Sequence, residues 1–152
     1  MMTTSYRITS NTLAILPAYN PYYQSKILEM NETIPIKTKA INIIKENCIH
    51  YGANYHGRQI SVRHHLDYQQ KTPIPIHTEK GLYAYPAQSP SAYDCIWLLY
   101  HAVIHIEKGQ HPFTRTRIHF INEQSITVNI SYHTLKKQHH RAGMCKTVFA
   151  TL

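Results

Sequence analysis

The clearest pattern of apolar positions lies near the end of the chain. Five positions at alternating steps of three and four mark one face of a helix: Leu135, Gln138, Ala142, Cys145 and Phe149. Ser131 precedes this stripe and can accept a hydrogen bond from the first turn. The pattern therefore predicts a final helix that starts after Ser131, with Gly143 weakening it by about 1 kcal/mol relative to alanine.

Two further segments have helical features. Apolar side chains recur at helical spacing over residues 38–51, with Thr38 as a predicted N-cap and Gly52 as a natural C-terminal stop. Residues 57–68 have a weaker period and are interpreted as a helix or, alternatively, a strand. The helical alternative directs Ile60 and Leu66 inward and leaves Arg58 and Arg63 outward.

The remaining apolar positions predict short strands. Residues 5–16 give one or two strands, and hairpins are expected over 24–37, around Asn31-Glu32, and over 115–130, around Asn122-Glu123. The two prolines of Pro73–Ile76 favour an edge strand or a linker to one, and an alternating segment follows at 82–86. Residues 95–106 are apolar at both parities, which predicts one central strand.

These elements predict an α+β fold formed by a single domain over residues 1–152. Its mainly antiparallel sheet has about eight short strands, and about three helices pack beside it. The chain has 152 residues, of which 43% are hydrophobic, enough for one core. No apolar run suits a signal peptide or a membrane span, so we expect a cytoplasmic protein with no membrane partner. Three widely spaced cysteines, Cys48, Cys95 and Cys145, are expected to be reduced and buried.

Charge adds the first functional indication. The formal net charge is +8, and the segment from Lys108 to the end holds seven basic residues against one acidic residue. Residues 1–107 hold nine basic residues against seven acidic residues. Positive charge concentrated in one third of the chain favours a polyanionic partner over diffuse solubilising charge. The alternative is a basic protein with no anionic partner.

The sequence offers little for catalysis. It contains two Asp and six scattered Glu, and it has no GxSxG, HExxH or glycine-rich phosphate motif. Twelve histidines raise the possibility of zinc, but the adjacent pairs His64-His65 and His139-His140 point apart, and no two cysteines have a zinc-knuckle spacing. We therefore expect no enzyme, no metal site and no cofactor, with the histidines on surfaces and strand faces.

Several fragments, read in order, carry a resemblance. They are Cys48-x-x-Tyr51-Gly52-x-x-Tyr55-x-Gly57-Arg58, Lys71-x-Pro73-Ile74-Pro75-Ile76, and Tyr85-Pro86-x-x-x-Pro90-x-x-x-x-Cys95-x-Trp97 followed by His101. The tail adds Phe120-Ile121-Asn122, Ile130-Ser131, Gln138 and Arg141. In this combination, from about Thr12 to Phe149, the chain resembles the ComK family of competence transcription factors.

The resemblance implies an activator that binds A/T-rich promoter boxes as an oligomer built from dimers and switches on DNA-uptake genes. It also implies RNA polymerase and an adaptor of a Clp-type protease as partners. Longer members of the family continue past the position of Leu152. The resemblance therefore implies that DNA binding is retained more securely than activation or proteolytic control.

Eight cations are the candidate DNA-binding residues: Arg58, Arg63, Lys71, Arg115, Arg117, Lys136, Lys137 and Arg141. A/T tracts have a narrow, electronegative minor groove that attracts arginine. Arg58 directly follows a loop flanked by Gly52 and Gly57, and it is the first candidate for a groove contact. Arg115 and Arg117 share one face of a predicted strand, about 6 to 7 Å apart, and suit successive phosphates.

Each candidate has a structural alternative. Arg58 can instead hold its own loop by pairing with a carboxylate, and the cations of the hairpin and of the last helix can simply face water. Trp97 is interpreted as a core residue rather than a wedge between bases. The competing functions are a binding module for RNA or another polyanion, a protein-interaction domain, and a small histidine-dependent nuclease.

Overall fold

The larger of two antiparallel sheets organises the computed structural model, which describes residues 5–111 and 114–152. Its six strands lie in the order β3-β2-β1-β6-β5-β4. Their bounds are β1 (Thr12–Pro17), β2 (Ser25–Glu29), β3 (Thr33–Ile36), β4 (Ile74–His77), β5 (Leu82–Pro86) and β6 (Trp97–Leu99). The central strand β6 is buried along its whole length, which explains why its residues are apolar at both parities. The predicted hairpin around Asn31-Glu32 is confirmed as β2 and β3.

Both edge strands of this sheet contain a proline. Pro35 lies in β3, opposite Lys26 of β2, and Pro75 lies in β4, opposite Tyr83 of β5. Proline has no backbone N–H to donate, so a sheet tolerates it mainly at an edge. The edge position predicted for Pro73–Ile76 is confirmed.

The smaller sheet has three strands in the order β7-β8-β9. They are β7 (Val103–His111), β8 (Thr114–Phe120) and β9 (Ser125–Val128), and the predicted hairpin around Asn122-Glu123 is confirmed as β8 and β9. The prediction of one strand over 95–106 was wrong. A 3₁₀ turn at Tyr100–Ala102 ends β6 and redirects the chain into β7, so the apolar run serves two sheets in succession.

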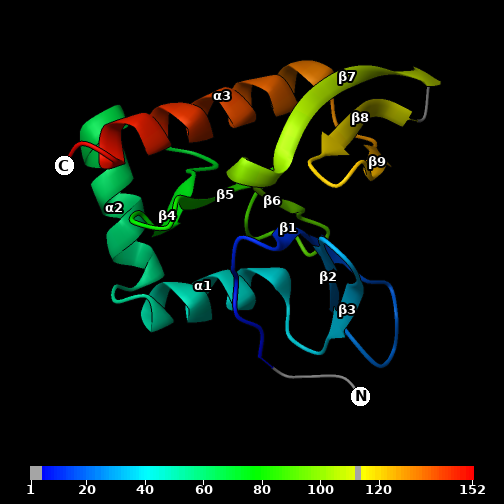
Figure 1. Cartoon of the computed structure of the whole chain (residues 1–152), viewed down its shortest axis with the longest axis horizontal. Coiled ribbons are helices and arrows are strands. Elements are labelled where there is room, and N and C mark those ends of the chain that lie inside the picture. The colour runs from blue at the N-terminus through cyan, green and yellow to red at the C-terminus, as the bar shows by residue number, and fades with distance from the viewer. Residues whose placement is uncertain (1–4, 112–113) are drawn as a thin grey trace.

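Three helices frame the sheets: α1 (Ala40–His50), α2 (Tyr55–Leu66) and α3 (Tyr132–Phe149). In Figure 1, α3 runs along the top of the molecule past β5 and β7, α1 lies at the opposite side, and α2 stands between their ends. Ser131 caps α3 through the amide of Thr134, as predicted.

The details of α1 and α2 differ from expectation. The N-cap of α1 is Lys39 rather than Thr38. The segment after Gly52 is a helix, and it begins at Tyr55 because Asn54 accepts a hydrogen bond from the Gly57 amide. Ile60, expected inward, is 53% exposed, and Val62 is buried in its place.

Buried side chains from both sheets, α1 and α3 form one main cluster, with Trp97, Tyr85 and Phe120 among the largest. The core position predicted for Trp97 is therefore confirmed, and the three cysteines are free and buried, as expected. The α+β class with mainly antiparallel strands is also confirmed. Within the described residues, no helix is long and apolar enough to span a membrane.

Candidate nucleic-acid interface

The first half of α3 and the loop before β4 together form a basic hollow. Its volume is about 450 Å³, and its cationic lining residues are Lys71, Lys137 and Arg141, with His133 beside them. Asp67 is the one carboxylate of the lining. Three of the predicted cations, separated by up to 70 positions in the sequence, thus surround one opening.

Two polar side chains of α3 hold the hollow in shape. Gln138 is buried and donates to the carbonyl oxygens of Lys71, at 2.8 Å, and Pro86, at 2.9 Å. Arg141 donates to the carbonyl of Gln70 and to Oε1 of Gln138, both at 3.0 Å, and its guanidinium lies 4.4 Å from the centre of the Tyr68 ring. Arg141 therefore lines the hollow in a fixed position and also contributes a positive charge to it.

A second basic feature lies beside the hollow, where the first turn of α3 meets β7. The ammonium groups of Lys136 and Lys108 lie 5.9 and 5.6 Å from the centre of the Tyr132 ring. This arrangement joins the exposed Lys108 of β7 to the basic side of α3. Sequence reasoning counted Lys108 in the basic third of the chain but did not select it, and it missed His133, because neither position has a distinctive local pattern.

The outer face of the small sheet presents Arg115 and Arg117. Both side chains are exposed, whereas the intervening Thr116 is buried, so the shared face predicted for the two arginines is confirmed. Arg117 lies opposite Glu107 of β7 and Thr127 of β9.

Glu107 introduces a negative charge on this face. Nε2 of His119 lies 2.7 Å from its Oε1, and Nε2 of His105 lies 4.0 Å from its Oε2. The hydrogen bond from His119, with charges of His119, His105 and Arg117 nearby, lowers the pKa of Glu107. The face therefore combines two exposed arginines with a carboxylate that contacts histidines.

Arg58 does not point outward as expected. Its guanidinium donates to four carbonyl oxygens: Ala53 at 3.2 Å, Cys48 at 3.1 Å, Tyr51 at 3.3 Å, and Pro75. These acceptors belong to the end of α1, the turn before α2, and β4. The structural alternative, that Arg58 holds its loop, fits this geometry, with carbonyl groups in place of the carboxylate considered from the sequence. Arg63 is half-buried, and its Nε lies 3.4 Å from Oγ1 of Thr72.

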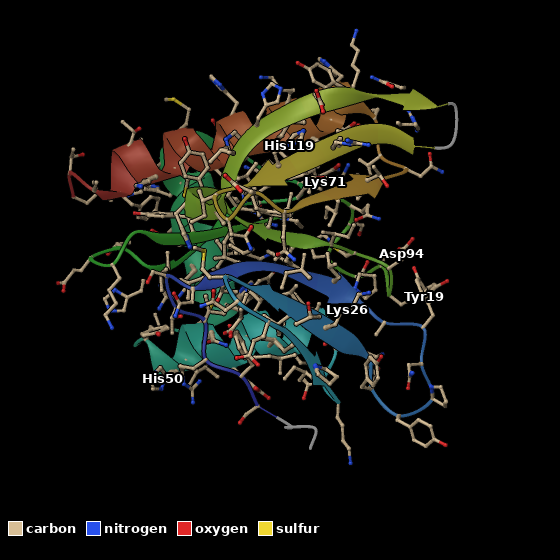
Figure 2. All side chains as sticks on the ribbon, turned by 45° about the vertical axis from the view of Figure 1, so that its right-hand side comes forward. Tyr19, Lys26, His50, Lys71, Asp94 and His119 are labelled. Atoms are coloured by element: carbon tan, nitrogen blue, oxygen red, sulfur yellow. The ribbon has the colours of Figure 1, made fainter. Side chains whose placement is uncertain are left out.

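Among the described residues, no lysine or arginine forms an ion pair with a carboxylate. Every Lys, Arg, Asp and Glu of the chain lies in the described segments, and the only ion pairs there join Glu107 to the two histidines. In Figure 2, Lys71 and His119 lie in the half of the molecule that contains α3 and the small sheet, whereas Lys26 and His50 lie in the other half. The candidate cations other than Arg58 thus leave charge available to an anionic partner.

Nothing in residues 5–111 and 114–152 brings three metal-ligating side chains together. Burial raises the pKa of the Cys48 and Cys95 thiols to about 11 and that of Cys145 to about 12. The thiols therefore stay protonated near neutral pH and are poor nucleophiles.

Comparison with known proteins agrees with the fragments described above. The competence transcription factor of Bacillus subtilis (strain 168) is 24% identical over 147 residues, which cover 95% of this chain and 75% of that protein. No solved structure matches the chain. The family model described as ComK protein matches residues 3–151. Since that match spans the sheets, the helices and the basic hollow alike, the chain belongs to the ComK family.

Proposed function

We propose that this protein is a sequence-specific DNA-binding regulator of transcription that acts on competence genes. The family and the related competence transcription factor support this role. The single observation that carries DNA binding is the basic hollow, where Lys71, Lys137 and Arg141 converge without a lysine or arginine ion pair among the described residues.

The hollow suits a phosphate of the DNA backbone. Phosphate contacts supply much of the affinity of DNA-binding proteins, and lysine and arginine provide most of them. Arg141 is held by two hydrogen bonds and by Tyr68, so its guanidinium loses little freedom on binding. Lys136 and Lys108 extend the same basic surface toward the small sheet.

Preference for A/T-rich boxes is assigned to Arg115 and Arg117. An A/T tract narrows the minor groove and strengthens its negative potential, which rewards an inserted arginine. These two guanidinia are exposed, whereas that of Arg58 is occupied by carbonyl groups of its own chain. We accordingly assign Arg58 to the stability of the fold and groove contacts to the hairpin.

The wider setting follows from the same proposal. A regulator of promoters works in the cytoplasm, and two equivalent A/T half-sites call for a symmetric homodimer. RNA polymerase and an adaptor of a Clp-type protease are its proposed protein partners.

Fluorescence anisotropy with labelled A/T-rich duplex, G/C-rich duplex and RNA tests the proposal. We expect tightest binding to the A/T-rich duplex, with a slope of log affinity against log salt of about −4 to −5 for four to six neutralised phosphates. A flat salt titration, or equal affinity for RNA, would contradict DNA recognition.

Variants locate the contacts. Lys137→Ala should weaken binding to every duplex alike and reduce the salt slope by about one, whereas Arg117→Ala should also reduce the preference for A/T. Lys37→Ala and Arg7→Ala are matched controls, because both side chains are exposed and lie outside the basic hollow and the small sheet. If the controls lose as much affinity as the test variants, the surface assignment is wrong.

A further inference from the structure

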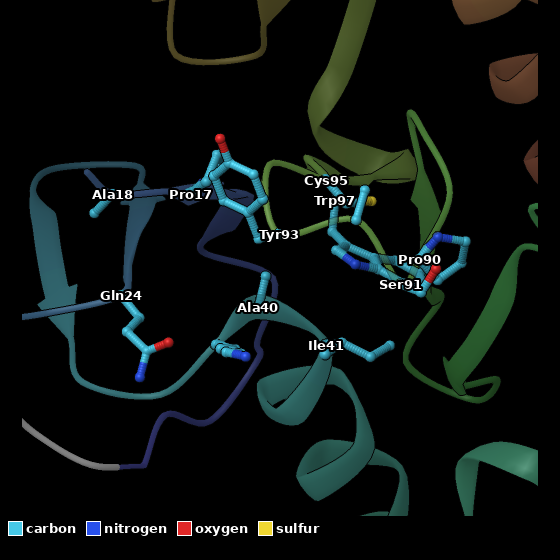
Figure 3. Close-up of a pocket in the computed structure, with 12 residues that line it drawn as sticks. Pro17, Ala18, Gln24, Ala40, Ile41, Pro90, Ser91, Tyr93, Cys95 and Trp97 are labelled. Atoms are coloured by element: carbon cyan, nitrogen blue, oxygen red, sulfur yellow. The ribbon is translucent and has the colours of Figure 1, made fainter. Parts of the chain in front are cut away.

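A small pocket lies where the start of α1 meets the loop between β5 and β6. Its volume is about 190 Å³. Its lining includes Pro17, Ala40, Ile41, Pro90, Tyr93 and Trp97, and we call it the Trp97 pocket. Figure 3 shows the indole of Trp97 between the Pro90–Ser91 turn and the first residues of α1, with its nitrogen toward α1. The basic hollow shares no lining residue with this pocket.

The indole of Trp97 carries a donor without an acceptor. The side chain is 0% exposed, and its Nε1 has no hydrogen-bond partner among the described residues. A buried indole N–H usually has a partner, because leaving it unpaired costs the hydrogen bond that it makes with water in the unfolded chain. The pocket therefore contains a donor that a bound molecule can satisfy.

The start of α1 adds positive potential to the same pocket. Lys39 is the N-cap and makes no side-chain hydrogen bond to the helix, and the first turn contains no acidic residue. The first amides of a helix have no acceptor within it and carry the positive end of its dipole. Lys39 itself lines the pocket and is exposed, so the lining includes a residue with a full positive charge.

We propose that the Trp97 pocket binds a small carboxylate with a short apolar body. The carboxylate would accept hydrogen bonds from the indole N–H and from the α1 amides, which are arranged like other anion sites at helix N-termini. Pro17, Ile41 and Pro90 would contact the apolar part. An engineered cavity of about 150 Å³ is large enough for benzene, so this pocket suits a ligand of roughly six to eight non-hydrogen atoms.

Trp97 is the only tryptophan of the chain, so its indole N–H gives a single, assigned NMR resonance. Isovalerate has the required carboxylate and branched apolar body, and isovaleramide is its uncharged counterpart. At constant ionic strength, isovalerate should move the indole resonance downfield in a saturable way and raise the unfolding temperature. Isovaleramide should bind at least about tenfold more weakly, since a charge-assisted bond is about twice as strong as a neutral one.

Lys39→Ala should lower the affinity for isovalerate roughly tenfold, because the substitution removes a positive charge from the pocket lining. Lys37→Ala, an exposed lysine two positions earlier, should leave the affinity unchanged. Absence of a saturable shift of the indole resonance would overturn the proposal. So would equal affinity for isovalerate and isovaleramide, or an equal effect of the two lysine variants. Because the measurement needs no DNA, its outcome is independent of the proposed DNA binding.

Discussion

Arg58 was predicted to contact DNA, but its contacts in the structure indicate a role in stabilising the fold. Its position after the loop between Gly52 and Gly57 suggested a groove contact. Its guanidinium instead joins α1, the turn before α2, and β4 through four carbonyl oxygens. Removing a charged donor from several partly buried acceptors leaves them without a partner. The residue therefore connects three elements that no backbone ladder joins.

Arg58→Ala should lower the free energy of unfolding by about 2 to 3 kcal/mol, and urea denaturation measures this loss. Arg58→Lys should restore only part of it, because lysine cannot reproduce the planar fork of donors. Arg7→Ala, an exposed control, should change stability by less than about 0.5 kcal/mol. If Arg58→Ala keeps full stability but loses the preference for A/T-rich DNA, Arg58 contacts the minor groove rather than stabilising the fold.

His139 makes stability depend on pH. Its ring stacks on Tyr100, with ring centres 4.7 Å apart, and its Nδ1 lies 2.8 Å from the Tyr85 hydroxyl oxygen. Burial lowers the pKa of His139, and Lys136 and His140 lower it further. Burial also lowers the pKa of His101, against the opposing effect of its bond to the Ser10 carbonyl.

A lowered histidine pKa means that the unfolded chain takes up the proton first as the pH falls. Stability is therefore retained above the ordinary histidine pKa of about 6.5 and declines below it. The unfolding temperature should drop between about pH 7.5 and about pH 5.5, and His139→Gln should reduce that drop. The exposed control His133→Gln should leave that drop unchanged. If His139→Gln also leaves it unchanged, His139 is not the cause of the pH dependence of stability.

At the scale of elements, α3 contains a glycine where helix propensity alone would favour alanine. A Cβ at Gly143 would lie 2.8 Å from the hydroxyl oxygen of Tyr100 and 3.2 Å from its Cζ. The Tyr100 ring packs against the core and stacks on His139, which lies one turn before Gly143 in α3, so the ring has little room to move. The glycine is explained by this close approach of a side chain to the helix.

Gly143→Ala should therefore lower stability by about 1 kcal/mol, although propensity predicts a gain of similar size. Thermal denaturation of the single variant and of the Gly143→Ala, Tyr100→Phe double variant separates the two effects. The double variant should recover stability relative to the single one because the hydroxyl is gone. A clear stabilisation by Gly143→Ala alone would show that Tyr100 moves aside freely.

Elements with strong local signals were predictable from the sequence. α3 has both a cap and a regular stripe, and the two hairpins have turn residues between alternating strands. The break at Tyr100–Ala102 was not predictable, since strands buried in two successive sheets give the same unbroken apolar run. The period of α2 was weak because Val62 is its only fully buried residue.

The candidate site was predictable in its parts but not in its assembly. The cations of α3 and β8 followed from charge and periodicity, and the structure confirms that they lie on exposed faces. Their association with Lys71 depends on a hydrogen bond between residues 67 positions apart, from Gln138 to the Lys71 carbonyl. Local patterns contain no information about such a contact.

At the scale of the whole molecule, the proposed function predicts a symmetric homodimer. Sedimentation velocity, with and without an A/T-rich duplex carrying two half-sites, should detect two protomers per complex. A duplex with one half-site should bind more weakly and lose the second protomer. Monomers under every condition would contradict two-fold recognition.

The prolines at both borders of the large sheet limit how such protomers can join. A neighbouring chain that added a strand beside β3 or β4 would meet Pro35 or Pro75 and lack a donor there. Open-ended stacking of copies into fibres along this sheet is therefore disfavoured. Dimerisation then uses surfaces other than β3 and β4. The edge strands can therefore resist aggregation without preventing the specific pairing of two protomers.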